Sequence, residues 1–180
     1  MIVCDTGPLV AAALSNDSDH KACVELFTAL HAARRELLVP ATVIAEVGYL
    51  LAREAGARVE SLFLQSLADG DFTPVDLTSA DFARMADLVN AYESLPLGTT
   101  DASVVAVAER LGLTDVATLD RRHFTVVRPR HVDALPCCPE TSAGRRGCVD
   151  LAVAAITGRY LDSEDRGPQA RQALTGQWLR

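Results

Sequence analysis

The chain has 180 residues, nearly half of them apolar, and a formal net charge of −7. This length suits one domain with room for an extension, and the apolar share is large enough to form a sizeable core. No stretch approaches the roughly 18 apolar residues of a membrane span, and no basic segment opens the chain, so neither a membrane anchor nor a secretory signal is expected.

The cysteines and the net charge indicate the cellular location and the kinds of ligand to expect. Five cysteines without an export signal favour reduced thiols, and the cytoplasm is the expected location. A metal site built from Cys137, Cys138 and Cys148 is disfavoured, because the Cys-x-x-Cys spacing of zinc sites is missing. The negative charge predicts weak non-specific binding to nucleic acid, but a polyanionic substrate is not excluded, because basic residues cluster locally around Arg121 and Arg122.

The first half of the chain alternates apolar runs with amphipathic segments. Residues 2–4 read as a short buried strand, and the Asp5-Thr6-Gly7-Pro8 segment that follows is typical of a helix start, with cap residues and a proline in the first turn. Further elements are predicted as a helix from residue 17 onward, a strand at 37–40, and helices at 42–55 and 58–68.

The second half continues this alternation. A strand at 72–75 is expected at a sheet edge, because it contains Pro74. Helices are predicted from residue 78 or 79 to about 93 and at 100–111, and strands at 116–119 and 124–127. Strands that alternate with helices predict an α/β fold with a mostly parallel sheet. The pattern degrades after residue 136, so residues 1–136 are expected to form the domain and residues 137–180 a poorly ordered C-terminal extension.

Four acidic residues stand where strands are predicted to end or helices to begin. Asp5 and Asp120 follow predicted strands, and parallel sheets bind their ligands outside the carboxyl ends of the strands. Glu46 and Asp101 share a helix face with apolar residues three and four positions away, so both are expected to point inward. Thr6, next to Asp5, is placed to orient a carboxylate or a bound water.

Each acid alone has an ordinary explanation, as a helix cap or a first-turn acid. Together they do not, because two unit charges about 4 Å apart repel by roughly 4 kcal/mol at an effective dielectric near 20. Either some of the four carry protons, or a divalent cation with oxygen ligands lies among them, with Mg²⁺ or Mn²⁺ expected.

Four segments carry a resemblance to a known family: Ile-Val-Cys-Asp-Thr-Gly at 2–7, Val-Ile-Ala-Glu-Val at 43–47, Leu-Gly-Thr-Thr-Asp-Ala-Ser at 97–103 and Ala-Thr-Leu-Asp-Arg-Arg-His-Phe at 117–124. In order and spacing they resemble PIN-domain ribonucleases, above all the VapC toxins of bacterial toxin–antitoxin pairs. The likeness runs from residue 1 to about residue 136.

The resemblance implies a PIN-like α/β/α sandwich with a five-stranded, mostly parallel sheet, and endonucleolytic hydrolysis of RNA that depends on Mg²⁺ or Mn²⁺. The family's catalytic and metal-binding acids correspond to Asp5, Glu46, Asp101 and Asp120, and its hydroxyl to Thr6. A cognate antitoxin and a homodimer are implied as well. Residues 137–180 have no counterpart in the family.

Other functions stay open at this stage. A PIN domain can mature RNA without an antitoxin, and an inactive binding domain can keep the acids for stability. A receiver-like regulatory module is disfavoured, because it needs a paired acid at the first strand and a late lysine, whereas Lys21 is the chain's one lysine. Arg121 and Arg122 either contact RNA phosphates or are simply solvated.

Overall fold

The computed structural model describes residues 1–138, and the predicted extension lies outside the described residues from residue 139 onward. The described residues form five strands and seven helices, in the order β1 (Ile2–Cys4), α1 (Thr6–Ala13), α2 (His20–Ala32), β2 (Leu37–Pro40), α3 (Ala41–Ala55), α4 (Ala57–Asp69), β3 (Thr73–Val75), α5 (Ser79–Ala91), α6 (Thr99–Leu111), β4 (Val116–Ala117), α7 (Arg121–Val126) and β5 (Cys137–Cys138).

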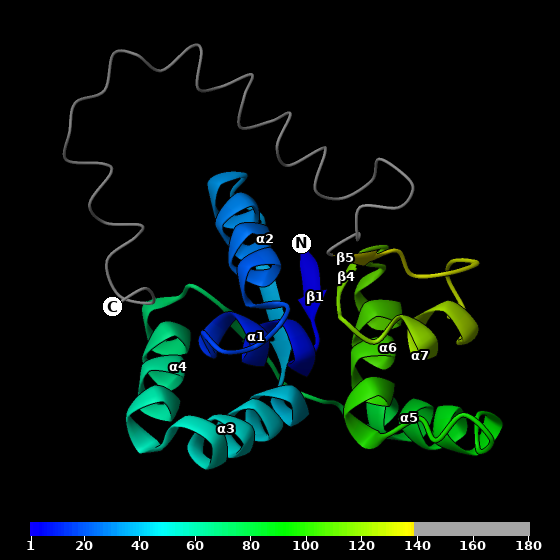
Figure 1. Cartoon of the computed structure of the whole chain (residues 1–180). Coiled ribbons are helices and arrows are strands. Elements are labelled where there is room, and N and C mark those ends of the chain that lie inside the picture. The colour runs from blue at the N-terminus through cyan, green and yellow to red at the C-terminus, as the bar shows by residue number, and fades with distance from the viewer. Residues whose placement is uncertain (139–180) are drawn as a thin grey trace, which may run out of the picture.

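The strands form one parallel sheet in the order β3-β2-β1-β4-β5. The predicted edge position of β3 is confirmed. Because all the strands run the same way, their carboxyl ends meet at one edge of the sheet, toward α3 and α5 in Figure 1. The strand order reverses between β1 and β4, and this is where open α/β sheets bind their ligands.

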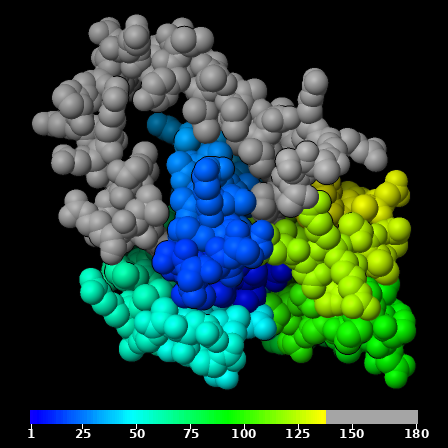
Figure 2. All heavy atoms as spheres, viewed as in Figure 1, coloured from blue at the N-terminus to red at the C-terminus, as the bar shows by residue number. Residues whose placement is uncertain are grey.

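The sheet is covered on both faces, which explains why its strands are apolar runs without alternation. All three residues of β1 and all four of β2 are buried. Helix α6 packs against β1 and β2, and its residues 102–108 are buried without interruption, which small side chains such as Ala102 and Ser103 allow. In the space-filling view the α1–α2 pair lies between α3–α4 on one side and α5–α7 on the other (Figure 2).

One predicted strand is wrong. Residues 124–127 carry β-branched side chains, yet Arg121–Val126 is the helix α7. The side chain of Asp120 accepts a hydrogen bond from the backbone N–H of His123, and burial of Phe124 anchors the short helix on the core. This capping and packing override the local strand propensity.

The fifth strand instead lies at Cys137–Cys138, directly after the predicted domain limit at residue 136. It pairs with Val116 and Ala117 of β4. None of the helices in the described part of the chain is both long and apolar enough to cross a membrane.

Candidate metal centre

Asp5 lies at the end of β1 and caps α1. Its side chain is buried, and it receives two hydrogen bonds: the backbone N–H of Thr6 donates to Oδ1 at 2.7 Å, and the hydroxyl of Thr118 donates to Oδ2 at 2.7 Å. Burial raises the pKa of Asp5 to about 6; the two hydrogen bonds oppose this rise, and the charges of Asp101 and Glu46 add to it. The carboxylate is therefore fixed in position and reluctant to carry an unbalanced charge.

Thr118 joins the ends of β1 and β4. While its hydroxyl donates to Asp5, the same oxygen accepts a hydrogen bond from the backbone N–H of Asp120 at 2.9 Å. Helix α1 packs closely against the segment after β4 at this point. A Cβ atom at Gly7 would lie only 3.3 Å from the Cβ of Leu119. The ends of the neighbouring strands thus hold Asp5 and Asp120 close to each other through Thr118.

Glu46 comes from α3, and its predicted inward orientation is wrong. Its neighbours Val43 and Val47 are buried, but Glu46 itself is exposed. Its Oε2 accepts a hydrogen bond of 2.6 Å from the hydroxyl of Thr6. Glu46 therefore approaches the other acids from the solvent side, and Thr6 connects it to the end of β1.

Asp101 lies in the first turn of α6 and is half-buried. Its Oδ2 accepts a hydrogen bond of 3.2 Å from the backbone N–H of Gly98. Burial raises the pKa of Asp101, the Gly98 hydrogen bond and His123 lower it, and the charges of Asp120 and Glu46 raise it further. The outcome is a raised pKa, as expected of a carboxylate among other carboxylates.

His123 is the residue that the sequence reasoning missed as a member of the site. It lies one turn into α7, and its Nδ1 is 2.8 Å from Oδ2 of Asp120 and 3.1 Å from Oδ2 of Asp101. The three side chains offer ligand atoms that all lie within 4.8 Å of one another. An i,i+3 spacing from Asp120 was the available signal, but it has meaning only if residues 121–126 are helical.

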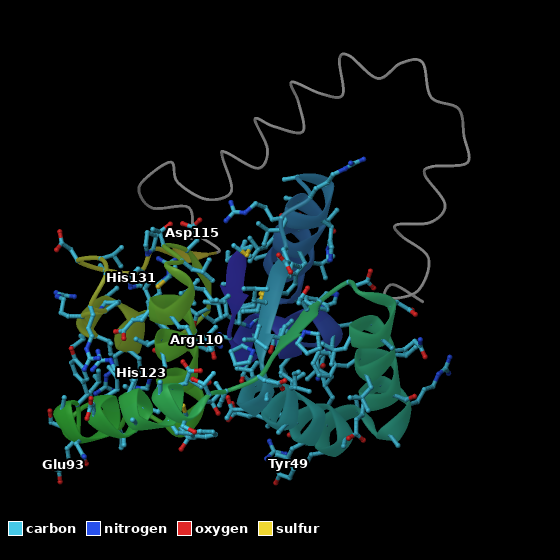
Figure 3. The ribbon with its side chains drawn as sticks, turned by 180° about the vertical axis from the view of Figure 1, so that it is seen from behind. Tyr49, Glu93, Arg110, Asp115, His123 and His131 are labelled. Carbon is cyan, nitrogen blue, oxygen red and sulfur yellow. The ribbon has the colours of Figure 1, made fainter. Side chains whose placement is uncertain are left out.

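The two arginines predicted to contact phosphate lie beside this cluster. Arg121 and Arg122 form the first turn of α7 and are exposed, immediately after Asp120. Figure 3 shows His123 of the same helix near α5 and α6. The structure thus brings all four predicted acids and Thr6 to one edge of the sheet, with the arginines at its border.

The donor set fits a divalent cation. Carboxylate oxygens are the ligands that hard divalent ions prefer, and the raised pKa values of Asp5 and Asp101 mark charges that the protein alone does not balance. A buried atom, Nδ1 of His123, makes no hydrogen bond of proper geometry although it faces two carboxylates. The cluster can therefore hold a metal ion, whose positive charge would neutralise the carboxylates.

Comparison with known proteins identifies the family. A model of the PIN domain matches residues 2–128. The chain is 32% identical over 128 residues to ribonuclease VapC26 of Mycobacterium tuberculosis, covering 71% of this chain and 93% of that protein. The fold matches the crystal structure of VapC20 from Mycobacterium tuberculosis, described as a toxin that cleaves the sarcin-ricin loop, with a TM-score of 0.63 and 18% identity, covering 74% of this chain and 99% of that one. This chain therefore belongs to the PIN-domain family and, within it, to the VapC ribonucleases.

Proposed function

We propose that the chain is a Mg²⁺- or Mn²⁺-dependent endoribonuclease and the toxin of a toxin–antitoxin pair. The observation that carries the proposal is the convergence of Asp5, Glu46, Asp101 and Asp120 from four separate segments, joined through Thr6, Thr118 and His123. Membership of the VapC ribonucleases supports RNA as the substrate and the cytoplasm as the place of action. It gives no support to a receiver-like module.

The protein's own residues have separable roles in this mechanism. Asp5 and Asp101 would bind the ion directly, and Glu46 and Asp120 would bind it directly or through water. The ion, when bound, supplies a water of lowered pKa for attack on the phosphodiester and stabilises the leaving oxygen. Thr6 orients Glu46 through its 2.6 Å hydrogen bond. No side-chain nucleophile is required.

Substrate binding uses positive charge beside the acids. Arg121 and Arg122 follow Asp120 directly and are exposed, which supports a role for their guanidinium groups in binding RNA phosphates. This arrangement also explains how a chain of net charge −7 accepts a polyanion: the acids are neutralised by the metal, and the arginines border them.

The proposed partners are an antitoxin and a second copy of the chain, as in the family that the sequence resembles. An acid-lined centre attracts an arginine or lysine side chain, so an antitoxin that inserts one would occupy the metal's place and block cleavage. Induced expression with and without the adjacent small gene tests this. We expect growth arrest without that gene and normal growth with it. Normal growth on expression of soluble protein alone would favour RNA maturation without an antitoxin.

RNA cleavage tests the enzymatic part directly. Purified protein incubated with total cellular RNA should produce discrete new 5′ ends with Mn²⁺ or Mg²⁺ and none with a chelator, and mapping those ends identifies the target. Asp101→Asn should lower the rate more than about a hundredfold, because losing a ligand should cost at least what losing its supporting contacts costs. Asp69→Asn, at an exposed carboxylate of α4, is the matched control. Cleavage by Asp101→Asn at the wild-type rate would overturn the mechanism.

A further inference from the structure

We infer that His123 is itself a metal ligand, through Nδ1, of the ion held by Asp101 and Asp120, and that this nitrogen biases the centre toward transition-metal ions such as Mn²⁺ over Mg²⁺. The inference rests on the proposed metal centre and adds a ligand that is not a carboxylate. It starts from the position of one atom, which lies 2.8 Å from one carboxylate oxygen and 3.1 Å from the other.

These separations match the edges of a coordination polyhedron. Two ligands at right angles about a small octahedral cation, each about 2.1 Å from it, lie about 3 Å from each other. Nδ1 of His123 stands at this separation from both Oδ2 atoms, and the three ligand atoms all lie within 4.8 Å of one another. Both distances from Nδ1 therefore suit a nitrogen and a carboxylate oxygen that bind the same small cation.

The ordinary role for such a histidine is a hydrogen bond to one of the acids. That role predicts an N–H aimed at one oxygen. Instead Nδ1 is buried and makes no hydrogen bond of proper geometry, although two carboxylates lie within 3.1 Å of it. A buried nitrogen that lies close to two carboxylate oxygens but forms a proper hydrogen bond with neither suits a cation shared by all three side chains.

The surrounding contacts hold the ring in that position. Oδ1 of Asp120 accepts from the backbone N–H of His123 at 3.0 Å, which leaves Oδ2 of the same carboxylate facing the ring. On the other side, the backbone N–H of Gly98 holds Oδ2 of Asp101. The His123 side chain is only 15% exposed, compared with 38% for that of Asp120. The imidazole is thus largely buried beside two carboxylates that backbone N–H groups hold in position.

An imidazole ligand changes which ion is preferred. Carboxylates and water suit both Mg²⁺ and Mn²⁺. An imidazole nitrogen is a softer ligand, which first-row transition-metal ions accept more readily than Mg²⁺ does, although Mn²⁺ stands lowest in their affinity order. A centre with four acids alone would separate Mn²⁺ from Mg²⁺ mainly by size. With His123 as a ligand, removal of the imidazole should weaken Mn²⁺ more than Mg²⁺.

The test is a pulsed electron paramagnetic resonance measurement on the Mn²⁺-loaded full-length protein, which detects ¹⁴N bound to the ion. We expect nitrogen coupling in the wild type and in His131→Ala, and its loss in His123→Ala and His123→Asn. His131 is the matched control, because its ring contacts the carbonyl of Leu113 at 2.6 Å and also has a buried Nδ1 without a hydrogen bond. The wild-type spectrum needs no variant, so a misfolded substitution does not prevent the test.

Calorimetric titration of the same proteins measures their preference for Mn²⁺ over Mg²⁺. The dissociation constant for Mn²⁺ should rise about tenfold or more in His123→Ala, and that for Mg²⁺ by a much smaller factor. Mn²⁺ that binds in an Asp101-dependent manner without nitrogen coupling, or coupling that persists without His123, would overturn the inference and leave the proposed nuclease intact. Absence of any Asp101-dependent Mn²⁺ binding would overturn both.

Discussion

The carboxylate of Asp5 accepts hydrogen bonds from Thr6, just after β1, and from Thr118, just after β4. Such a buried group is stabilised in one orientation, but its charge is costly without a cation. The same balance applies to Asp101, which is less buried and receives one backbone hydrogen bond. Both carboxylates are therefore oriented by hydrogen bonds while their negative charge remains costly in the metal-free protein.

This balance predicts how the stability of the metal-free protein depends on pH. Asp5 in the folded state has a pKa of about 6, above the ordinary value of 3.8. Between these values the folded state binds more protons than the unfolded chain, so the free energy of unfolding should fall as pH rises through this window. This shift in the pKa of Asp5 corresponds to about 3 kcal/mol in the free energy of unfolding. That contribution is present at low pH and is lost once the pH has risen above about 6.

Urea denaturation of metal-free wild type and Asp5→Asn between pH 4 and pH 7.5 measures this. The wild type should lose stability relative to Asp5→Asn as the pH rises, because asparagine has no charge to bury. The comparison cancels the other titrating groups, which both proteins share. Parallel pH profiles for the two proteins would show that Asp5 does not titrate as described.

The sequence was sufficient to find the four acids but not their contacts. An acid at the end of an apolar run is visible in the letters, as for Asp5 and Asp120. The exposure of Glu46 depends on how α3 packs on the rest of the domain, and its apolar neighbours gave the wrong direction. The role of Thr118 requires the pairing of β1 with β4, which has no local signal.

At the level of elements, the regular helices and the first three strands agree with the predictions to within about three residues, because their apolar periodicity is strong and their ends carry caps or glycines. The largest difference is the start of α2, which was predicted at residue 17 and lies at His20. The failures are the shortest elements. Residues 124–127 were predicted as a strand from propensity, and β5 was not predicted at all, since its two residues leave no pattern to read. Elements of this length are decided by tertiary contacts.

One contact between helices bears on the site. The hydroxyls of Thr42 in α3 and Ser103 in α6 lie 2.6 Å apart, and Ser103 donates onward to the carbonyl of Thr100 at 2.7 Å, so Thr42 is the donor between them. Thr42 precedes Glu46 by one helical turn, and Ser103 follows Asp101 by two residues. This pair therefore sets the spacing of the two helices that carry Glu46 and Asp101.

The two hydroxyls should be energetically coupled: removing both should destabilise the protein by less than the sum of the two single removals. Ser103→Ala should lower the free energy of unfolding by about 1–2 kcal/mol, because Thr42 loses its acceptor in a half-buried place. Thr42→Val should behave similarly, and the double variant should lose less than the two single losses combined. Denaturation of the four proteins measures this coupling. Strictly additive losses would mean that the two hydroxyls act independently.

For the whole molecule, the parallel sheet with β1 at its centre places all the site segments at one edge (Figure 1). We propose that the domain extends to residue 138 rather than 136, because β5 completes the sheet beside β4. A chain ending at Cys138 should fold and cleave RNA like the full protein.

A chain ending at Pro136 removes β5 and should be less stable by about 1–2 kcal/mol, for the ladder hydrogen bonds that it loses. Thermal melting and RNA cleavage by both truncated chains provide the comparison with the full-length protein. An unfolded or inactive chain ending at Cys138 would show that residues 139–180 contribute to the core or to the substrate site.

The acids at the carboxyl edge are proposed to bind divalent metal as a unit, and metal-dependent melting tests this most directly. With Mn²⁺ at 100 times its dissociation constant, the folded wild type should gain about 2.7 kcal/mol, because the unfolded chain has no assembled site. Asp69→Asn, which alters an exposed carboxylate of α4, should gain as much, and Asp5→Asn and Asp101→Asn should gain little or nothing. Equal stabilisation of all four proteins would place the ion elsewhere and contradict the account.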